Sequence, residues 1–205
     1  MKLVLVMNLK KTLFVIVFLG FSLPVFAKSN DILKQLSQAQ NVPALTKKQG
    51  YVMVYVNVSG VAPSIEFSKV NTHKTSFILS QEKISYGRDY FLDLQNIKQG
   101  FYFMPMFAGV YQITRVNAPF YDLPYWLPTD KESKWRFAVE ENHINFIGEI
   151  NIAKERGKKT LNIHLLNRTA TYHAEIIEQI ALMSQKLPLK AKPGYRDDFL
   201  LAHGE

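Results

Sequence analysis

Apolar and polar side chains alternate along most of the chain between residues 51 and 166, and this period of two constrains the fold more than any other feature. In the segment 51–58, valines occupy every even position, and larger or polar side chains occupy the odd ones. Successive side chains of a β-strand point to opposite faces, so the valines are expected on one buried face. The same alternation predicts strands at 65–70, 75–79, 89–94, 101–107, 110–116 and 135–140.

The segments 144–152 and 160–166 form the best-defined predicted hairpin, with Gly157 in the turn. One face is expected to be apolar and carries Ile144, Phe146, Gly148, Ile150, Ile152, Leu161, Ile163 and Leu165. The opposite face is mostly polar and carries Asn145, Glu149, Asn151, Asn162 and His164. Antiparallel sheets are commonly covered on one face only, so we expect the polar face to be solvated.

Helical periodicity is found only near the two ends of the mature chain. A short helix is expected at 29–36, and apolar residues that recur every three to four positions predict an amphipathic helix over 171–186. Thr169 or Thr171 can cap this helix, and Pro188 is expected to end it. Short strands without intervening helices therefore favour an antiparallel β-sandwich with a C-terminal amphipathic helix and a short N-terminal helix.

Residues 1–27 have the features of a secretory signal peptide. Three lysines precede an apolar run at 13–21, and the sequence Val25-Phe26-Ala27 matches a small-x-small cleavage site. The apolar run is shorter than the roughly 20 residues that span a bilayer, so we expect cleavage before Lys28 and a soluble, exported protein. Retention of the segment as a membrane anchor is the alternative.

The mature chain is expected to consist of a short helix and linker at 28–49, a β-sandwich domain with its helix at 50–189, and a loosely ordered tail at 190–205. It contains no cysteine, which excludes disulfides, thiolate metal sites, a cysteine nucleophile and a lipoprotein anchor, and favours a bacterial periplasm. The formal charge of +8 falls to +5 without the three leader lysines. The remaining basic residues are scattered, so nucleic acid is not an expected partner.

No catalytic motif is found in the sequence. There is no GxSxG or SxxK nucleophile motif, and the five histidines lack the spacing of a zinc protease. His164, His173 and Glu175 are the only histidine and carboxylate residues expected to meet, and exposed histidines on polar faces are the alternative. A pair of carboxylates acting in glycoside hydrolysis would have to come from Asp122, Asp130, Glu132, Glu140 and Glu141.

The segment 118–135 is the strongest candidate for a binding surface. It contains three prolines and five large aromatic residues, namely Phe120, Tyr121, Tyr125, Trp126 and Trp135. Prolines lower the entropy that a loop loses on binding, and Tyr and Trp offer flat apolar faces with a polar group. The alternative is that these aromatics fold back and fill the open end of the sandwich.

Three short motifs resemble a known group of proteins. They are Gly100-Phe-Tyr, Phe137-Ala-Val-Glu140 and Asn145-Phe-Ile-Gly-Glu-Ile150. This combination resembles small bacterial envelope proteins that have a prealbumin-like or carboxypeptidase-regulatory-like β-sandwich. The resemblance covers about residues 50–166, and it implies an antiparallel sandwich and a binding or structural role without catalytic residues.

These observations predict an exported, non-catalytic binding or accessory protein of the bacterial cell envelope, acting without a cofactor or metal. The expected partner is an envelope protein or a glycan. Two alternatives remain open: an envelope hydrolase that uses carboxylates on glycan, and a structural subunit that pairs with another chain through an edge strand.

Overall fold

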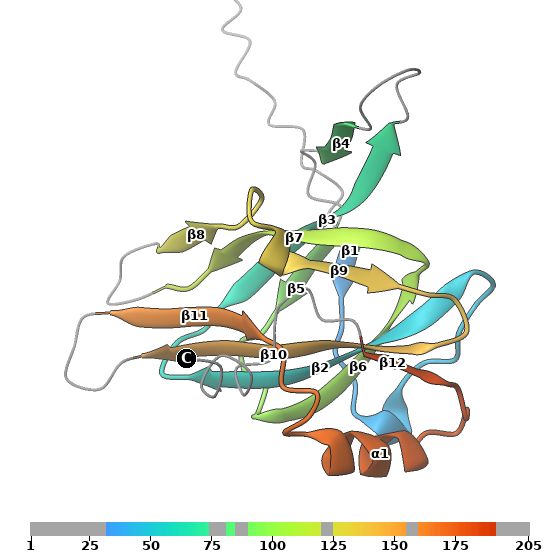
Figure 1. Ribbon diagram of the computed structural model, residues 1–205. Helices are drawn as coiled ribbons and strands as arrows, with labels where there is room; N and C mark the ends of the chain where they lie inside the picture. The colour runs from blue at the N-terminus through green and yellow to red at the C-terminus, as the bar shows by residue number, and fades with distance from the viewer. Residues whose placement is uncertain (1–31, 74–80, 85–89, 120–124, 155–159, 192–205) are drawn as a thin grey trace, which may run out of the picture.

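The computed structural model describes residues 32–73, 81–84, 90–119, 125–154 and 160–191, and within them the protein is mainly β (Figure 1). The strands form two mixed sheets, one of seven strands and one of five. None of the helices in these ranges is long and apolar enough to cross a bilayer. A mainly β architecture is what the period of two predicted.

The seven-stranded sheet has a continuous run of five strands. Their order is β1 (Ile32–Lys34), β5 (Tyr90–Asp93), β3 (Ser64–His73), β7 (Gly109–Asn117) and β8 (Trp126–Pro128). Two further strands pair outside this run: β4 (Gln81–Ile84) with β3, and β9 (Arg136–Val139) with β7. All pairings in this sheet are antiparallel except that of β1 with β5.

The five-stranded sheet contains two parallel pairings. Its order is β11 (Leu161–Leu166), β10 (Ile144–Lys154), β2 (Gln49–Ser59) and β6 (Gly100–Phe107), and β12 (Leu189–Ala191) also pairs with β10. β10 runs parallel to both β2 and β12. The expectation of purely antiparallel sheets is therefore wrong. Between β2 and β10 the chain builds most of the other sheet, and this long crossover allows the two strands to run in one direction.

Both sheets contribute to one hydrophobic core. Val52, Val54 and Val56 of β2 lie in the same buried cluster as Phe67 of β3 and Ile113 of β7. The buried face predicted for the valines is confirmed. The predicted strand at 75–79 lies outside the described residues.

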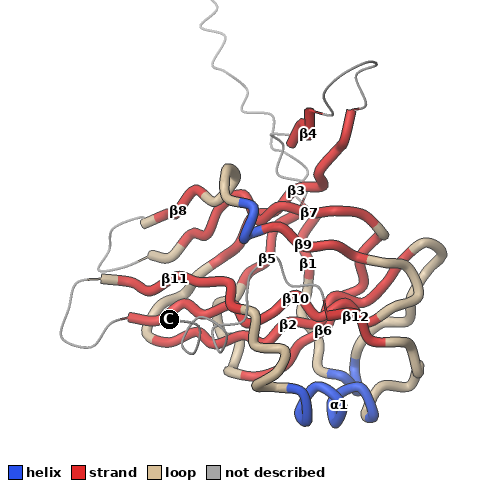
Figure 2. The backbone as a smooth tube through the Cα atoms, in the orientation of Figure 1, coloured by secondary structure: helices blue, strands red, loops and turns tan. Residues whose placement is uncertain are grey.

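A second core covers the opposite face of the five-stranded sheet, where solvent was expected. Tyr51, Met53 and Phe103 on this face pack with Ile176 and Met183, which lie in and just after the helix α1 (His173–Ala181). Figure 2 shows this helix on the outer side of β2 and β6. The prediction of a solvated polar face is therefore wrong for two of its side chains, since Asn145 is only 3% exposed and Glu149 only 2%.

A bulge in β10 exchanges its two faces. The register with β2 shifts between Phe146 and Glu149, and Gly148 has a φ of +112°, which favours glycine. Phe146 accordingly belongs to the second core, whereas Ile150 and Ile152 belong to the core between the sheets. The prediction that these apolar residues share one face is wrong, because the extra residue of a bulge reverses the alternation that follows it.

The helices also differ from those expected. The segment after residue 31 forms β1 and a 3-10 turn, η1 (Ala39–Asn41), so the predicted N-terminal helix is wrong over its described residues. α1 is shorter than the predicted 171–186, and Tyr172 takes the N-cap position without a side-chain cap. β12 follows α1 and pairs with β10, which means that the helix is not the last regular element. β1 and β12 form by pairing with the distant strands β5 and β10, which local periodicity does not record.

Candidate functional site

The structure separates the predicted aromatic residues into different environments. Tyr125 and Trp126 are 44% and 53% exposed, whereas Trp135 is 1% exposed and belongs to the core between the sheets. Phe120 and Tyr121 lie outside the described residues. Trp135 therefore has the alternative role considered for these aromatics, that of a core side chain, and Tyr125 and Trp126 stay available at the surface.

Backbone hydrogen bonds fix the two exposed aromatics in place. Trp126 begins β8 and pairs with Asn117 of β7. The Ala118 N–H donates to the carbonyl of Tyr125 over 2.8 Å. In the strand order, β8 lies at the end next to β7. Two large apolar side chains are thus held on a sheet margin by a backbone that is already ordered.

A cation supports the exposed indole ring from the neighbouring strand. The guanidinium of Arg115 lies 4.9 Å from the centroid of the Trp126 ring, within the range of a cation–π contact. Arg115 also lies 3.9 Å from the carboxylate of Glu66, which is 4% exposed and accepts a 2.9 Å hydrogen bond from Asn117. We call Tyr125, Trp126 and Arg115 the β8 surface.

The candidate carboxylates for hydrolysis have different surroundings in the structure. Glu132 and Glu140 each make a 2.7 Å ion pair, with Lys134 and Lys190 respectively. Asp130 is half-buried, Glu141 is exposed, and Asp122 lies outside the described residues. Two of the four described acids are therefore paired with lysines.

The histidine cluster is likewise not assembled. His164 lies on β11 and His173 begins α1, and both are exposed, as is Glu175. No group of three histidine or acidic residues in the described part of the chain is placed to hold a metal ion.

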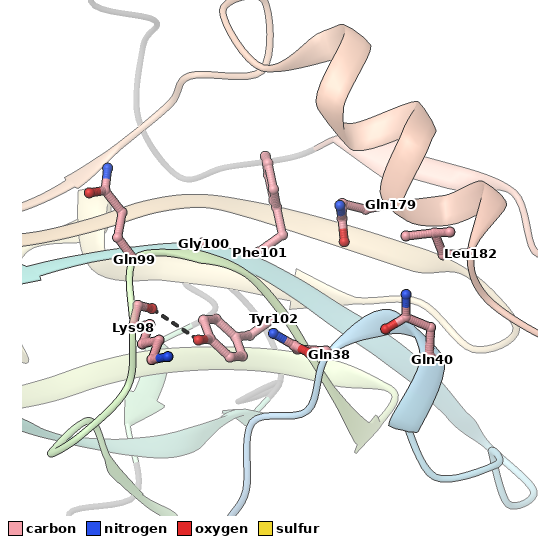
Figure 3. A pocket seen from close by; sticks show the side chains of 9 residues that line it. All are labelled: Gln38, Gln40, Lys98, Gln99, Gly100, Phe101, Tyr102, Gln179 and Leu182. Carbon is pink, nitrogen blue, oxygen red and sulfur yellow. Dashed lines mark hydrogen bonds between the residues drawn. The ribbon is translucent and has the colours of Figure 1, made fainter.

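The structure also shows a cleft that the sequence did not indicate. Figure 3 shows it between the segment around η1, the start of β6 and the end of α1. We call it the glutamine cleft, and the side chains that characterise it are Gln38, Gln40, Gln99, Gln179, Phe101 and Leu182. It is an open cavity of about 360 Å³, near the lower end of the roughly 300–1,000 Å³ typical of small-molecule sites.

Aromatic rings connect this cleft to the interior of the protein. Phe101 contacts the ring of Tyr55 edge to face at 4.8 Å, and Tyr55 stacks on Tyr172 with centroids 4.5 Å apart. Gln99 donates from Nε2 to the hydroxyl of Tyr55 over 2.9 Å. The rings therefore orient one of the cleft's glutamines.

A buried carboxylate holds the far side of this ring stack. Glu149 accepts hydrogen bonds from Tyr172 at 3.0 Å, from Asn57 at 3.0 Å and from Asn151 at 3.1 Å. It also forms a 2.9 Å ion pair with Arg168. Burial, together with the hydrogen bond to this carboxylate, raises the pKa of the Tyr172 hydroxyl well above its ordinary value. The hydroxyl consequently stays protonated and donates to Glu149, and this fixes the start of α1 on the sheet.

Comparison of the chain with protein-family models, curated proteins and solved structures found no match. The resemblance to prealbumin-like envelope proteins therefore stays a prediction.

Proposed function

We propose that the protein is an exported, non-catalytic accessory protein of the bacterial cell envelope that binds a partner protein through the β8 surface. The leader at 1–27 supports export to the periplasm, and the two sheets around a shared core support a β-sandwich that acts as a rigid scaffold. The observation on which the proposal depends is the exposure of Trp126 on an ordered strand.

The chemistry of the β8 surface favours a protein partner over a glycan. Trp, Tyr and Arg are the residue types enriched among those that contribute most to protein–protein binding. Here all three occur together, and the arginine is already positioned by the Trp126 ring and by Glu66. Because the backbone is paired on β7, little conformational entropy is lost on binding.

The first experiment compares capture of envelope proteins by the wild type and by the double variant Tyr125→Ala/Trp126→Ala. The matched control is Phe107→Ala/Val110→Ala, which removes two other exposed apolar side chains, 49% and 39% exposed. A protein retained by the wild type and the control, but lost with the double variant, is then purified for a direct measurement of Kd.

We expect the Kd for that purified partner to rise at least tenfold in the double variant, because interface aromatics of this kind contribute about 2 kcal/mol or more each. Thermal melting of the variant should match that of the wild type, since both side chains are exposed. An unchanged Kd, or an equal loss in the control, would contradict the proposal. Saturable binding of a soluble glycan at the β8 surface would show that the partner is a glycan and not a protein.

A further inference from the structure

The glutamine cleft is built from three segments that are distant in the sequence and fixed independently. Ser37 and Phe103 exchange two backbone hydrogen bonds, of 2.9 and 2.8 Å, and so fasten the chain before η1 to β6. Ala39, between the two glutamines of this segment, is buried in the second core. Ile176 is fully buried and anchors α1. The cleft therefore has walls that are ordered before any ligand arrives.

The polar groups of the cleft are mainly neutral carboxamides. Gln38 and Gln40 are exposed and Gln179 is half-buried, and all three line the cleft. Gln99 is oriented by its bond to Tyr55. Each carboxamide both donates and accepts hydrogen bonds, so the four glutamines place donors and acceptors around the same small cleft.

The other lining groups narrow the class of ligand. Phe101 and Leu182 give apolar surface, and Lys98 is the one charged residue among those that line the cleft. A strongly ionic ligand would find few charges to pair with. Sugar rings combine apolar C–H faces with hydroxyls that donate and accept, and they match apolar surface beside carboxamides.

A peptide fits this cleft less well than a sugar. Peptides that dock on sheets usually add a strand and use main-chain hydrogen bonds. Along β6, that position is taken at Phe103 by the backbone of Ser37. Recognition in the cleft is therefore expected to depend mainly on side chains, which suits the hydroxyls of a glycan.

We propose that the glutamine cleft is a binding site for a neutral oligosaccharide, separate from the β8 surface and independent of whether that surface binds a protein. The carboxamides of Gln40 and Gln179 hydrogen-bond the sugar hydroxyls from opposite walls, and Phe101 and Leu182 contact the ring faces.

The test uses the exported protein and calorimetric titration with three neutral probes, chitotetraose, cellotetraose and maltotetraose. An uncharged peptide, N-acetyl-tetraalanine amide, is titrated in parallel. We expect saturable binding of at least one saccharide, with a Kd of about 1 mM or tighter, and no binding of the peptide.

The variant Gln40→Leu/Gln179→Leu should weaken that Kd about tenfold or more, because it removes two hydrogen-bonding groups and keeps similar volume. Gln95→Leu is the matched control, since Gln95 is exposed and does not line the cleft, and it should leave the Kd unchanged. Thermal melting confirms that each variant is folded. If the double variant fails to fold, the single variant Gln40→Leu, at an exposed position, gives the same comparison.

Three results would overturn the assignment: no saccharide binding at about 1 mM, binding that the double variant leaves unchanged, or binding of the peptide alone. The variant Tyr125→Ala/Trp126→Ala separates this proposal from the proposed function. This variant should lose the protein partner but bind saccharide with the wild-type Kd. Failure of the proposed function and failure of the glycan site are therefore distinguishable.

Discussion

Replacement of Glu149 by alanine should cost more stability than replacement of any exposed carboxylate in this protein. The carboxylate is 2% exposed and is partnered by Asn57, Asn151, Tyr172 and Arg168. Hydrogen bonds to charged groups contribute about 1.5–3 kcal/mol, and breaking a buried ion pair costs about 3–5 kcal/mol. The Arg168 side chain is 34% exposed and can regain water, which lowers the expected loss to about 3 kcal/mol.

Urea and thermal denaturation of the wild type and of Glu149→Ala measure this loss directly. For a chain of this length, about 3 kcal/mol corresponds to a fall in Tm of roughly 6–12 °C. Glu132→Ala is the matched control, because its ion pair with Lys134 is slightly shorter, at 2.7 Å, but has both side chains more than 40% exposed. The control should lose less than about 1 kcal/mol.

The same reasoning predicts that Glu149 and Tyr172 are energetically coupled. In a double-mutant cycle with Glu149→Ala and Tyr172→Phe, residues that share a hydrogen bond show interaction free energies of about 0.5–3 kcal/mol. A loss below about 1 kcal/mol in Glu149→Ala, or a coupling of zero, would refute the idea that this buried network fixes α1. Loss of the network should also weaken saccharide binding, since α1 forms one wall of the glutamine cleft.

Three further predictions concern pH, the core and the leader. The pKa of Tyr172 is 10.0 in the unfolded chain and higher in the folded protein. The stabilisation by the neutral hydroxyl should therefore be complete below about pH 10. It should fall as the pH rises above this value, because the unfolded state then loses the hydroxyl proton first. Urea denaturation at pH 9 to 11 should show a steeper loss for the wild type than for Tyr172→Phe, and identical slopes would contradict the assignment. In the same assay, Trp135→Ala should lower the free energy of unfolding by about 3–5 kcal/mol, whereas Trp126→Ala should lower it by less than about 1 kcal/mol. Similar losses in the two variants would contradict the burial of Trp135 and the exposure of Trp126. N-terminal sequencing of protein recovered from the periplasm should begin at Lys28, and recovery of an intact leader in the membrane fraction would show that it acts as an anchor.

The sequence predicted those features that depend on neighbouring residues. The valines of β2 face the core between the sheets because strand geometry alone places alternate side chains on one face. The hairpin of β10 and β11 forms with Ile150 opposite Leu165 and Ile152 opposite Ile163, two pairs that the apolar pattern had placed on one face. The exposure of Tyr125 also agrees with a surface role for part of the aromatic segment.

Contacts between distant segments decided the rest. Trp126 and Trp135 both belong to the aromatic segment 118–135, yet Trp126 is exposed on β8 and Trp135 is buried. The pairing of β8 and β9 with β7 separates them, and neighbouring residues alone do not reveal it. Glu149 is polar and was expected in water, but Arg168 pairs with its charge and Tyr172, at the N-cap of α1, donates a hydrogen bond to it.

Local pattern therefore determined that the chain forms strands and which residues of β2 turn inward, since both follow from backbone geometry within a few residues. The second core, the reversal of faces at Gly148 and the glutamine cleft were decided only by the tertiary structure. Each of them depends on which segment packs on which sheet face, and that choice is made by the total apolar area buried between elements distant in the sequence. For the same reason, the glutamines of the cleft, which come from three separate segments, form no motif in the sequence.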